Sequence, residues 1–239
     1  MIYVISLRQN IILMYCSCES CHINNTFYSL MQEAGVDRFC HSRSEITIPA
    51  GKTFINEGDE IKSFKYLKEG LIKLHRLDSN GKEQIIFFGR PMDYISIQNT
   101  FSEKTYNYSV TAIENSTVCI FDINVMKDLI RTNGKFALKM VEISSMALNR
   151  IIDNSLELIS KTMYGKVASL LLFFSEKVYV TDNFDLPVSR KEIAQYTGLS
   201  IETVIRVISE FRRDGLIKVY GKKIEIVNKQ GLLSVLEHS

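Results

Sequence analysis

The sequence contains no tryptophan, only three prolines among 239 residues and no low-complexity run. It also has little net charge, because 29 lysines and arginines face 27 aspartates and glutamates, which gives +2 at pH 7. Hydrophobic residues still make up 46% of the chain, which is enough for compact cores and argues against intrinsic disorder. The length is that of one large or two ordinary domains. We therefore expect a folded protein.

Long hydrophobic runs are absent as well. No uninterrupted apolar stretch reaches the roughly 18 residues that a membrane-spanning helix needs, and Arg8, Gln9 and Asn10 interrupt the apolar N-terminus without a cleavage pattern after it. Five cysteines without a secretory signal favour free thiols in a reducing compartment. We expect a cytoplasmic protein with no membrane partner. Met14 precedes the cysteine cluster, so a further hypothesis is that translation begins there and not at Met1.

The usual catalytic motifs are missing too. The chain has no HExxH, no GxSxG and no phosphate-binding glycine loop, and its four histidines are scattered. We predict that it is not an enzyme.

Residues 186–228 predict a helix-turn-helix. Ser189 and Glu192 have the spacing of a capping box, which starts a short helix. Gly198 permits a tight turn, and Ser200 is placed to cap a second helix from residue 201 to about residue 214. One side of that helix is apolar at helical spacing, through Val204, Val207, Ile208 and Phe211.

A β-hairpin is expected after the second helix. Gly215 ends the helix, and residues 216–220 and 224–227 read as strands joined by a turn at Gly221 and Lys222. Residues 186–229 hold nine lysines and arginines against five acids, a net +4, compared with +2 for the chain. Positive charge is thus concentrated in a winged helix-turn-helix, where phosphates would lie.

Glu202 and Arg206 lie four positions apart near the start of the second helix. Such a helix enters the major groove with its N-terminal residues against base edges, where arginine binds guanine and glutamate accepts from cytosine. The alternative is an ordinary surface ion pair, but we favour DNA contact. The candidate DNA-binding residues are Ser189, Arg190, Ser200, Ile201, Glu202, Thr203, Ile205, Arg206, Lys222 and Lys223.

Residues 44–123 read as short strands separated by turn signals, which indicates an antiparallel sandwich or barrel. The sequence leaves open whether this barrel is a structural module or a ligand sensor. Residues 27–44 before it begin with a short amphipathic helical pattern.

Helices follow the strands. Asp122 or Asn124 caps one that runs to about residue 131, a longer helix spans about residues 135–161, and another covers residues 164–177 before a turn at 181–183. The long helix has a doubled apolar stripe, wide enough to cover the barrel and meet a second copy of the chain. The alternative is a single wide core helix. The predicted dimer-interface residues are Met140, Ile143, Ala147, Ile151 and Leu158.

The order of barrel, long helix and winged helix resembles the bacterial Crp/Fnr superfamily of transcription regulators. Its signature segments look like Glu57-Gly58-Asp59 with Gly70-Leu-Ile-Lys, and like residues 188–207 of the helix-turn-helix. The resemblance implies an α+β fold: an N-terminal double-stranded antiparallel β-barrel of jelly-roll type as sensor, a long dimerisation helix and a C-terminal winged helix-turn-helix. The expected parts are an N-terminal extension (1–26), the sensor with flanking helices (27–133), the dimerisation helix (134–161) and the DNA-binding domain (162–239).

The resemblance also implies function: a homodimer on palindromic double-stranded DNA that acts on RNA polymerase. Glu202 and Arg206 match the pair that reads the inner bases of each half-site. This chain has isoleucine at two positions where the branches of the family differ. The cyclic-AMP branch has arginine at the position of Ile201, and the oxygen-sensing branch has serine at the position of Ile205. The cyclic-AMP site corresponds to residues 92–95 and 106–109, which lack the phosphate-binding arginine. Because a buried phosphate needs a cation, cyclic AMP is not expected, and the effector is unknown.

The cysteines have two interpretations. Cys18 and Cys21 resemble the first Cys-x-x-Cys of the oxygen-sensing branch, and Cys119 matches its distant fourth iron-sulfur ligand, whereas Phe27 occupies the third ligand position. Cys16 could substitute, which gives Cys16, Cys18, Cys21 and Cys119 as tentative ligands of a cluster or zinc, with Cys40 as a further candidate. The alternative is a set of reduced thiols, with Cys119 a small core residue. A metal- or redox-responsive sensor whose main output is not DNA binding is the alternative function.

Overall fold

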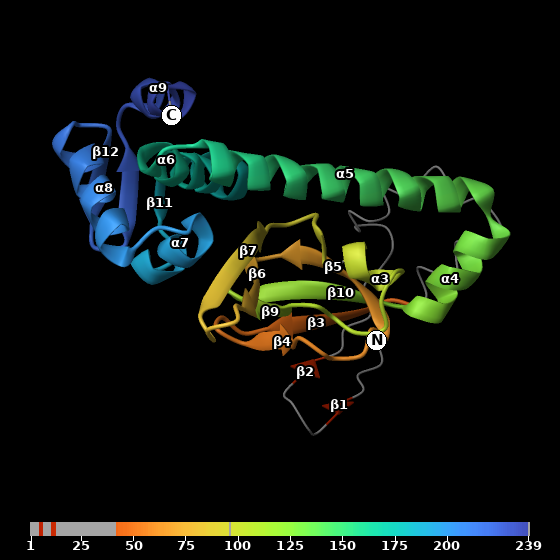
Figure 1. The fold of residues 1–239 in the computed structure, drawn as a ribbon. Helices are drawn as coiled ribbons and strands as arrows, with labels where there is room; N and C mark the ends of the chain where they lie inside the picture. The colour runs from red at the N-terminus through yellow and green to blue at the C-terminus, as the bar shows by residue number, and fades with distance from the viewer. Residues whose placement is uncertain (1–4, 7–10, 13–41, 96, 239) are drawn as a thin grey trace. The chain divides into compact units, whose positions relative to one another are not determined.

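The structure is a computed structural model that describes residues 5–6, 11–12, 42–95 and 97–238 (Figure 1). The chain divides into two compact units, residues 1–74 with 88–150 and residues 75–87 with 151–239. The predicted helical pattern at 27–41 and the thiols of Cys16, Cys18, Cys21 and Cys40 lie outside the described residues.

Two antiparallel four-stranded sheets form the sandwich (Figure 1). The first has the order β3 (Ser44–Ile48), β10 (Ser116–Asp122), β5 (Ser63–Glu69) and β8 (Tyr94–Ile95). The second has the order β4 (Thr53–Ile55), β9 (Ser109–Ala112), β6 (Ile72–Leu77) and β7 (Glu83–Gly89). Two short strands, β1 (Ile5–Ser6) and β2 (Ile11–Ile12), pair separately. The predicted barrel is thus jelly-roll-like but not closed.

The pairing of β5 with β10 decides which residues are buried on each side of the first sheet. Phe64 lies opposite Phe121, and Tyr66 opposite Cys119. Directly paired residues point to the same face of a sheet and alternate along the strand. The next pair, Leu67 and Val118, therefore points into the sandwich, where both are fully buried.

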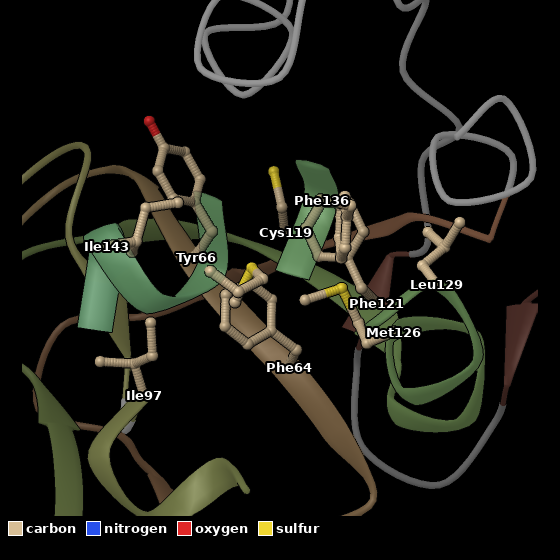
Figure 2. Packing of buried hydrophobic residues seen from close by; sticks show 10 residues of the cluster. Phe64, Tyr66, Ile97, Cys119, Phe121, Met126, Leu129, Phe136 and Ile143 are labelled. Atoms are coloured by element: carbon tan, nitrogen blue, oxygen red, sulfur yellow. The ribbon is translucent and has the colours of Figure 1, made fainter. Parts of the chain in front are cut away.

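Helices α4 (Ile123–Thr132) and α5 (Gly134–Ser160) cover the outer face of this sheet. The Asp122 carboxylate caps α4 by accepting from the backbone N–H groups of Asn124 and Val125, as an N-cap residue does. Figure 2 shows the resulting cluster, in which strand aromatics meet apolar side chains of the two helices. From α5 the cluster receives Phe136, Met140 and Ile143.

The packing of α5 bears on the predicted dimer interface. Met140 and Ile143 are buried by their own chain, and Ala147 packs against the same cluster. These three side chains therefore pack against residues of their own chain. Ile151 and Leu158 are half-buried. Apart from Met146, the exposed apolar residues of α5 lie on a different stripe, which holds Leu138, Val141, Leu148, Ile152, Leu156 and Ile159. A dimer face on this helix stays a prediction, and this exposed stripe is where we place it.

The second unit contains the helix-turn-helix and its wing. Its elements are α6 (Met163–Phe173), the π-helix η3 (Phe174–Tyr179), β11 (Asn183–Asp185), α7 (Arg190–Thr197), α8 (Ile201–Arg213), β12 (Ile217–Tyr220), β13 (Lys223–Ile226) and α9 (Lys229–Glu237). The wing strands form a sheet of order β11-β13-β12.

Three features of this half differ from the sequence expectation. The helix predicted over 164–177 divides into α6 and η3, and it ends at Val180 in a left-handed conformation with φ of 53°. Asn183, expected in a turn, starts β11, because it pairs with Glu225 of the wing. Helix α9 was not predicted, and in the first unit neither was the short helix α3 (Ile97–Thr100).

Gly70, between β5 and β6, offers a test of the sandwich. Its φ is +95°, and a Cβ there would lie 2.3 Å from Ser116 Oγ and 2.6 Å from Ser116 Cα. Left-handed strain and overpacking together predict that Gly70→Ala lowers the free energy of unfolding by about 2–5 kcal/mol. Urea denaturation followed by circular dichroism measures this loss.

The matched control is Gly81→Ala, at φ of +75° with no atom within 4 Å of the added Cβ. It should cost only the strain of about 1–2 kcal/mol. Equal losses for the two variants would show that the contact with Ser116 does not matter.

Candidate nucleic-acid interface

Helix α7 starts with the predicted capping box. Ser189 Oγ accepts from the Glu192 backbone N–H at 3.2 Å, and the Glu192 carboxylate accepts from the Ser189 backbone N–H at 2.9 Å. Gly198 ends the helix at φ of 72°, a conformation that favours glycine. The capping box, the glycine turn and the following cap at Ser200 confirm the helix-turn-helix read from the sequence.

Helix α8 has one buried side and one exposed side. Ser200 Oγ accepts from the Thr203 backbone N–H at 3.1 Å and so fixes the first turn. The buried side consists of Val204, Val207, Ile208 and Phe211. The exposed side, which we call the outward face of α8, holds Ile201, Glu202, Ile205, Arg206 and Ser209.

Glu202 and Arg206 do not pair with each other anywhere in the described structure. The Arg206 guanidinium instead contacts Met163 Sδ at 3.2 Å. A hydrogen bond to the backbone N–H of Glu202 itself, and then one from Ser200, hold the pKa of the Glu202 carboxyl below its usual value. Glu202 is therefore an acceptor at neutral pH, and the ion-pair alternative raised by the sequence is not what the structure has.

The remaining predicted DNA contacts lie at the start of α7 and in the wing. Ser189 is exposed and Arg190 is half-buried, and burial lowers the pKa of Arg190. Thr203 is half-buried, 3.1 Å from the Ser200 hydroxyl oxygen. Lys222 and Lys223 are exposed at the turn of the wing. Their contact with DNA stays a prediction.

Two other lysines of this unit form ion pairs with carboxylates. Lys218 pairs with Glu225 across the wing at 3.1 Å, and this contact raises the pKa of Lys218. Lys229 pairs with Glu176 and Asp182 at 3.2 and 3.3 Å. Among the described residues Lys222 and Lys223 have no such carboxylate partner, so their charges remain available to phosphates.

The segment that resembles the cyclic-AMP site is occupied by the chain's own groups. The Asp93 carboxylate accepts from both terminal nitrogens of Arg150 on α5 and from the Arg90 backbone N–H. Met92 beside it has a positive φ of 77°, which is strained for a residue with a side chain.

Lys65 is the amine near the other half of this segment. Its Nζ lies 2.8 Å from Ser63 Oγ and 2.8 Å from the Tyr106 hydroxyl. Burial lowers the pKa of Lys65 to about 8, with Asp59 acting in the opposite direction. Burial, and then the Asp59 charge, raise the pKa of Tyr106 to about 12. The Lys65 amine is thus partly buried and already bonded to groups of its own chain.

Cys119 is the one tentative metal ligand that the structure describes. It is buried in β10, and its Sγ donates to Glu45 Oε1 at 3.7 Å, while Lys68 Nζ holds the same carboxylate at 3.1 Å. A metal ligand must be a thiolate, whereas this sulfur is a hydrogen-bond donor beside a carboxylate. No group of three or more potential ligands occurs in the part of the chain that the structure describes. Because Cys16, Cys18, Cys21 and Cys40 lie outside the described residues, an iron-sulfur or zinc site stays a prediction.

Several of these contacts carry no signal in the sequence. Asp93 and Arg150, and Glu45 and Cys119, come together only through the tertiary fold. The same holds for the Tyr164 phenol, whose pKa is raised chiefly by its hydrogen bond to Glu210 of α8. None of these pairs has a sequence spacing that a local pattern could reveal.

The fold and the outward face of α8 define a DNA-binding regulator, and comparison with known proteins agrees. Residues 165–235 match the family model of the Crp-like helix-turn-helix domain, and residues 45–133 match that of the cyclic nucleotide-binding domain. The chain belongs to the Crp/Fnr superfamily of transcription regulators.

Curated relatives cover most of the chain. It is 28% identical over 216 residues to the nitrogen fixation regulation protein FixK of Bradyrhizobium diazoefficiens, which is 88% of this chain and 90% of that protein. It is 27% identical over 196 residues to the fumarate and nitrate reduction regulatory protein of Escherichia coli K12, which is 80% of this chain and 78% of that protein.

A solved structure shows the same fold. FixK2 from Bradyrhizobium japonicum has a TM-score of 0.72 at 24% identity and covers 81% of this chain and 96% of its own. None of the helices that the structure describes is long and apolar enough to span a membrane.

The cap of α8 gives a test of the interface. Ser200→Ala removes the acceptor for the Thr203 N–H, so the free energy of unfolding should fall by about 1 kcal/mol. Ser209→Ala is the matched control, because its exposed hydroxyl only donates back to the Ile205 carbonyl; it should change stability by less than about 0.5 kcal/mol. Thermal denaturation of both variants measures these losses of stability. Equal losses for the two variants would contradict the capping role of Ser200.

Proposed function

We propose that this chain is a homodimeric, sequence-specific regulator that inserts α8 into the major groove of a palindromic DNA operator. The observation that carries the proposal is the outward face of α8, where Glu202 and Arg206 are exposed and not paired with each other. A helix whose other side is buried can present such a face to a groove without giving up core contacts.

The chemistry of the two side chains suits base edges. Arg206 can donate two hydrogen bonds to guanine O6 and N7, and the Glu202 carboxylate can accept from the cytosine amino group. To reach a base, Arg206 would leave its contact with the Met163 thioether. Lys222, Lys223, Ser189 and Arg190 would then contact phosphates, which fixes the position of the helix but reads no sequence.

The exposed stripe of α5 supports the dimer. Leu138, Ile152 and Ile159 are separated by multiples of seven residues. Val141 follows Leu138 by three positions, and Leu148 precedes Ile152 by four. This is the heptad spacing of a coiled-coil seam. An exposed seam of this length would be costly on an isolated chain, and a second copy of α5 offers the same seam in return. A dimer places two α8 helices on half-sites about one helical turn, roughly 34 Å, apart.

In this proposal, α5 transmits the effect of a bound effector to the DNA-binding helices. At Arg150 this helix is held by Asp93, which lies in the segment expected to meet an effector. One turn later Asn154 accepts a hydrogen bond from the Tyr196 hydroxyl of α7, and Glu157 accepts from Ser169 of α6 at 2.8 Å. An effector that displaced Arg150 from Asp93 would change the populations of α5 arrangements, to which α7 is attached.

The finer details are part of the same proposal. We place the protein in the cytoplasm, with RNA polymerase as its partner and an effector other than cyclic AMP. We divide the chain into an extension (1–26), a sensor (27–133), a dimerisation helix (134–161) and a DNA-binding domain (162–239).

Arg206→Ala tests the base contact. On an operator selected from random duplex DNA by the unaltered protein, affinity should fall by about 1–3 kcal/mol and the preference for guanine at one position should be lost. Fluorescence anisotropy with single-base variants of the operator measures both. The control is Lys223→Ala, which should weaken all sequences alike and lower the slope of log affinity against log salt by about 1. Uniform weakening by Arg206→Ala would make Arg206 a phosphate contact.

Ile152→Glu tests the dimer seam. Placing two carboxylates opposite each other on paired α5 helices should weaken dimerisation by roughly a hundredfold or more. Sedimentation velocity should show a dimer for the unaltered protein and a monomer for the variant.

The control for this seam is Leu77→Glu, a similarly exposed leucine outside α5, which should leave the dimer intact. A monomeric unaltered protein, or a dimer that tolerates Ile152→Glu, would contradict the assignment of the seam.

A further inference from the structure

The outward face of α8 contains two isoleucines in its first two turns. Ile201 is 39% exposed and Ile205 is 50% exposed, and a separation of four positions puts them on the same side of the helix. The core contacts of α8 are made by other residues, Val204, Val207, Ile208 and Phe211. The two isoleucines therefore add apolar surface to the outward face without serving the core.

These isoleucines lie directly beside the polar pair. Ile201 precedes Glu202 in the chain, and Ile205 precedes Arg206, so each polar side chain has an exposed isoleucine next to it. A groove that receives Glu202 and Arg206 must also receive the two isoleucines. The question is which chemical group of DNA they can contact favourably.

The major groove offers one apolar group, the 5-methyl of thymine, among hydrogen-bond donors and acceptors. Isoleucine has no polar atom in its side chain, so it gains only by apolar contact. Its β-branch holds essentially one χ1 rotamer in a helix, so little side-chain entropy is lost on contact. Cytosine or adenine at the same place would leave an amino group facing isoleucine without an acceptor, which disfavours those bases.

We propose that Ile201 and Ile205 select thymine, through its 5-methyl group, at base pairs adjacent to those read by Glu202 and Arg206. This inference rests on the proposed function, because it needs α8 in the major groove, and it deepens that function by naming the flanking bases. The operator then combines a core read by hydrogen bonds with flanking thymines read by apolar contact.

Deoxyuridine tests the methyl group without any change to the protein. The probe is the operator selected from random duplex DNA by the unaltered full chain, with each thymine replaced singly by deoxyuridine, which lacks only the 5-methyl. Affinity should fall roughly three- to fivefold at each contacted thymine, the effect of withdrawing one buried methyl. Thymines outside the half-sites serve as the control for changes in the duplex itself and should show no loss.

The protein variants assign the methyl groups to side chains. Ile205→Ala should bind thymine and deoxyuridine equally at one position of the half-site and still discriminate at the other, and Ile201→Ala should do the reverse. Both should keep the guanine and cytosine preference that depends on Arg206 and Glu202. Neither side chain is among the buried residues of α8, so each variant should stay folded, which circular dichroism checks.

Each outcome decides between the two proposals. Equal binding of thymine and deoxyuridine at every position, with the Arg206-dependent guanine preference intact, overturns the thymine assignment and leaves the proposed function standing. The same holds if discrimination persists in both isoleucine variants, since another side chain then contacts the methyl. If no sequence is enriched, or Arg206→Ala leaves base preference unchanged, the proposed function fails and the thymine assignment fails with it.

Discussion

The burial of one side of α8 is the constraint on which the rest of the interface depends. Val204, Val207 and Phe211 are all almost completely inaccessible to solvent, so the helix cannot rotate about its axis without exposing a large apolar area. With the rotation fixed, the helical period alone places residues 201, 202, 205 and 206 outward. The cap at Ser200 fixes where the helix starts, and hence which of these positions comes first. The outward face of α8 is thus a consequence of core packing.

In helix α5 the helical period produces two apolar stripes on different sides of the helix. Phe136, Met140 and Ile143 bury one stripe in the cluster beneath it, and the exposed stripe runs along another side, from Leu138 to Ile159. A helix with only one of these stripes could cover the sheet or join a partner, but not both. Because the covered stripe is rigid in its packing, any change in the first unit that moves α5 also moves the exposed seam. The ion pair of Arg150 with Asp93 joins α5 to the segment that resembles the cyclic-AMP site.

Local patterns were enough for the helix-turn-helix and not for the contacts between distant segments. Capping boxes, glycine turns and apolar periodicity depend on neighbouring residues, so the limits of α7 and α8 could be predicted closely. The doubled stripe of α5 was also visible, but not which stripe faces the sheet, since Met140 and Leu138 are equally apolar and only packing separates them. The pairing of Asp93 with Arg150, 57 residues apart, is set by the fold and had no local signal. The strand β11 was missed because three residues gain strand geometry only from pairing with β13.

The charge distribution bears on how such a protein could be selective. Phosphate contacts supply affinity that does not depend on sequence, and two lysines of the second unit, Lys218 and Lys229, are paired with carboxylates. Lys222 and Lys223 are exposed at the turn of the wing. If α8 enters the groove as proposed, the base-specific part of the affinity would come from its outward face. A face that adds apolar contacts to hydrogen bonds raises this part without adding charge, so it increases the ratio of specific to non-specific binding, which is the quantity that matters among many competing sites.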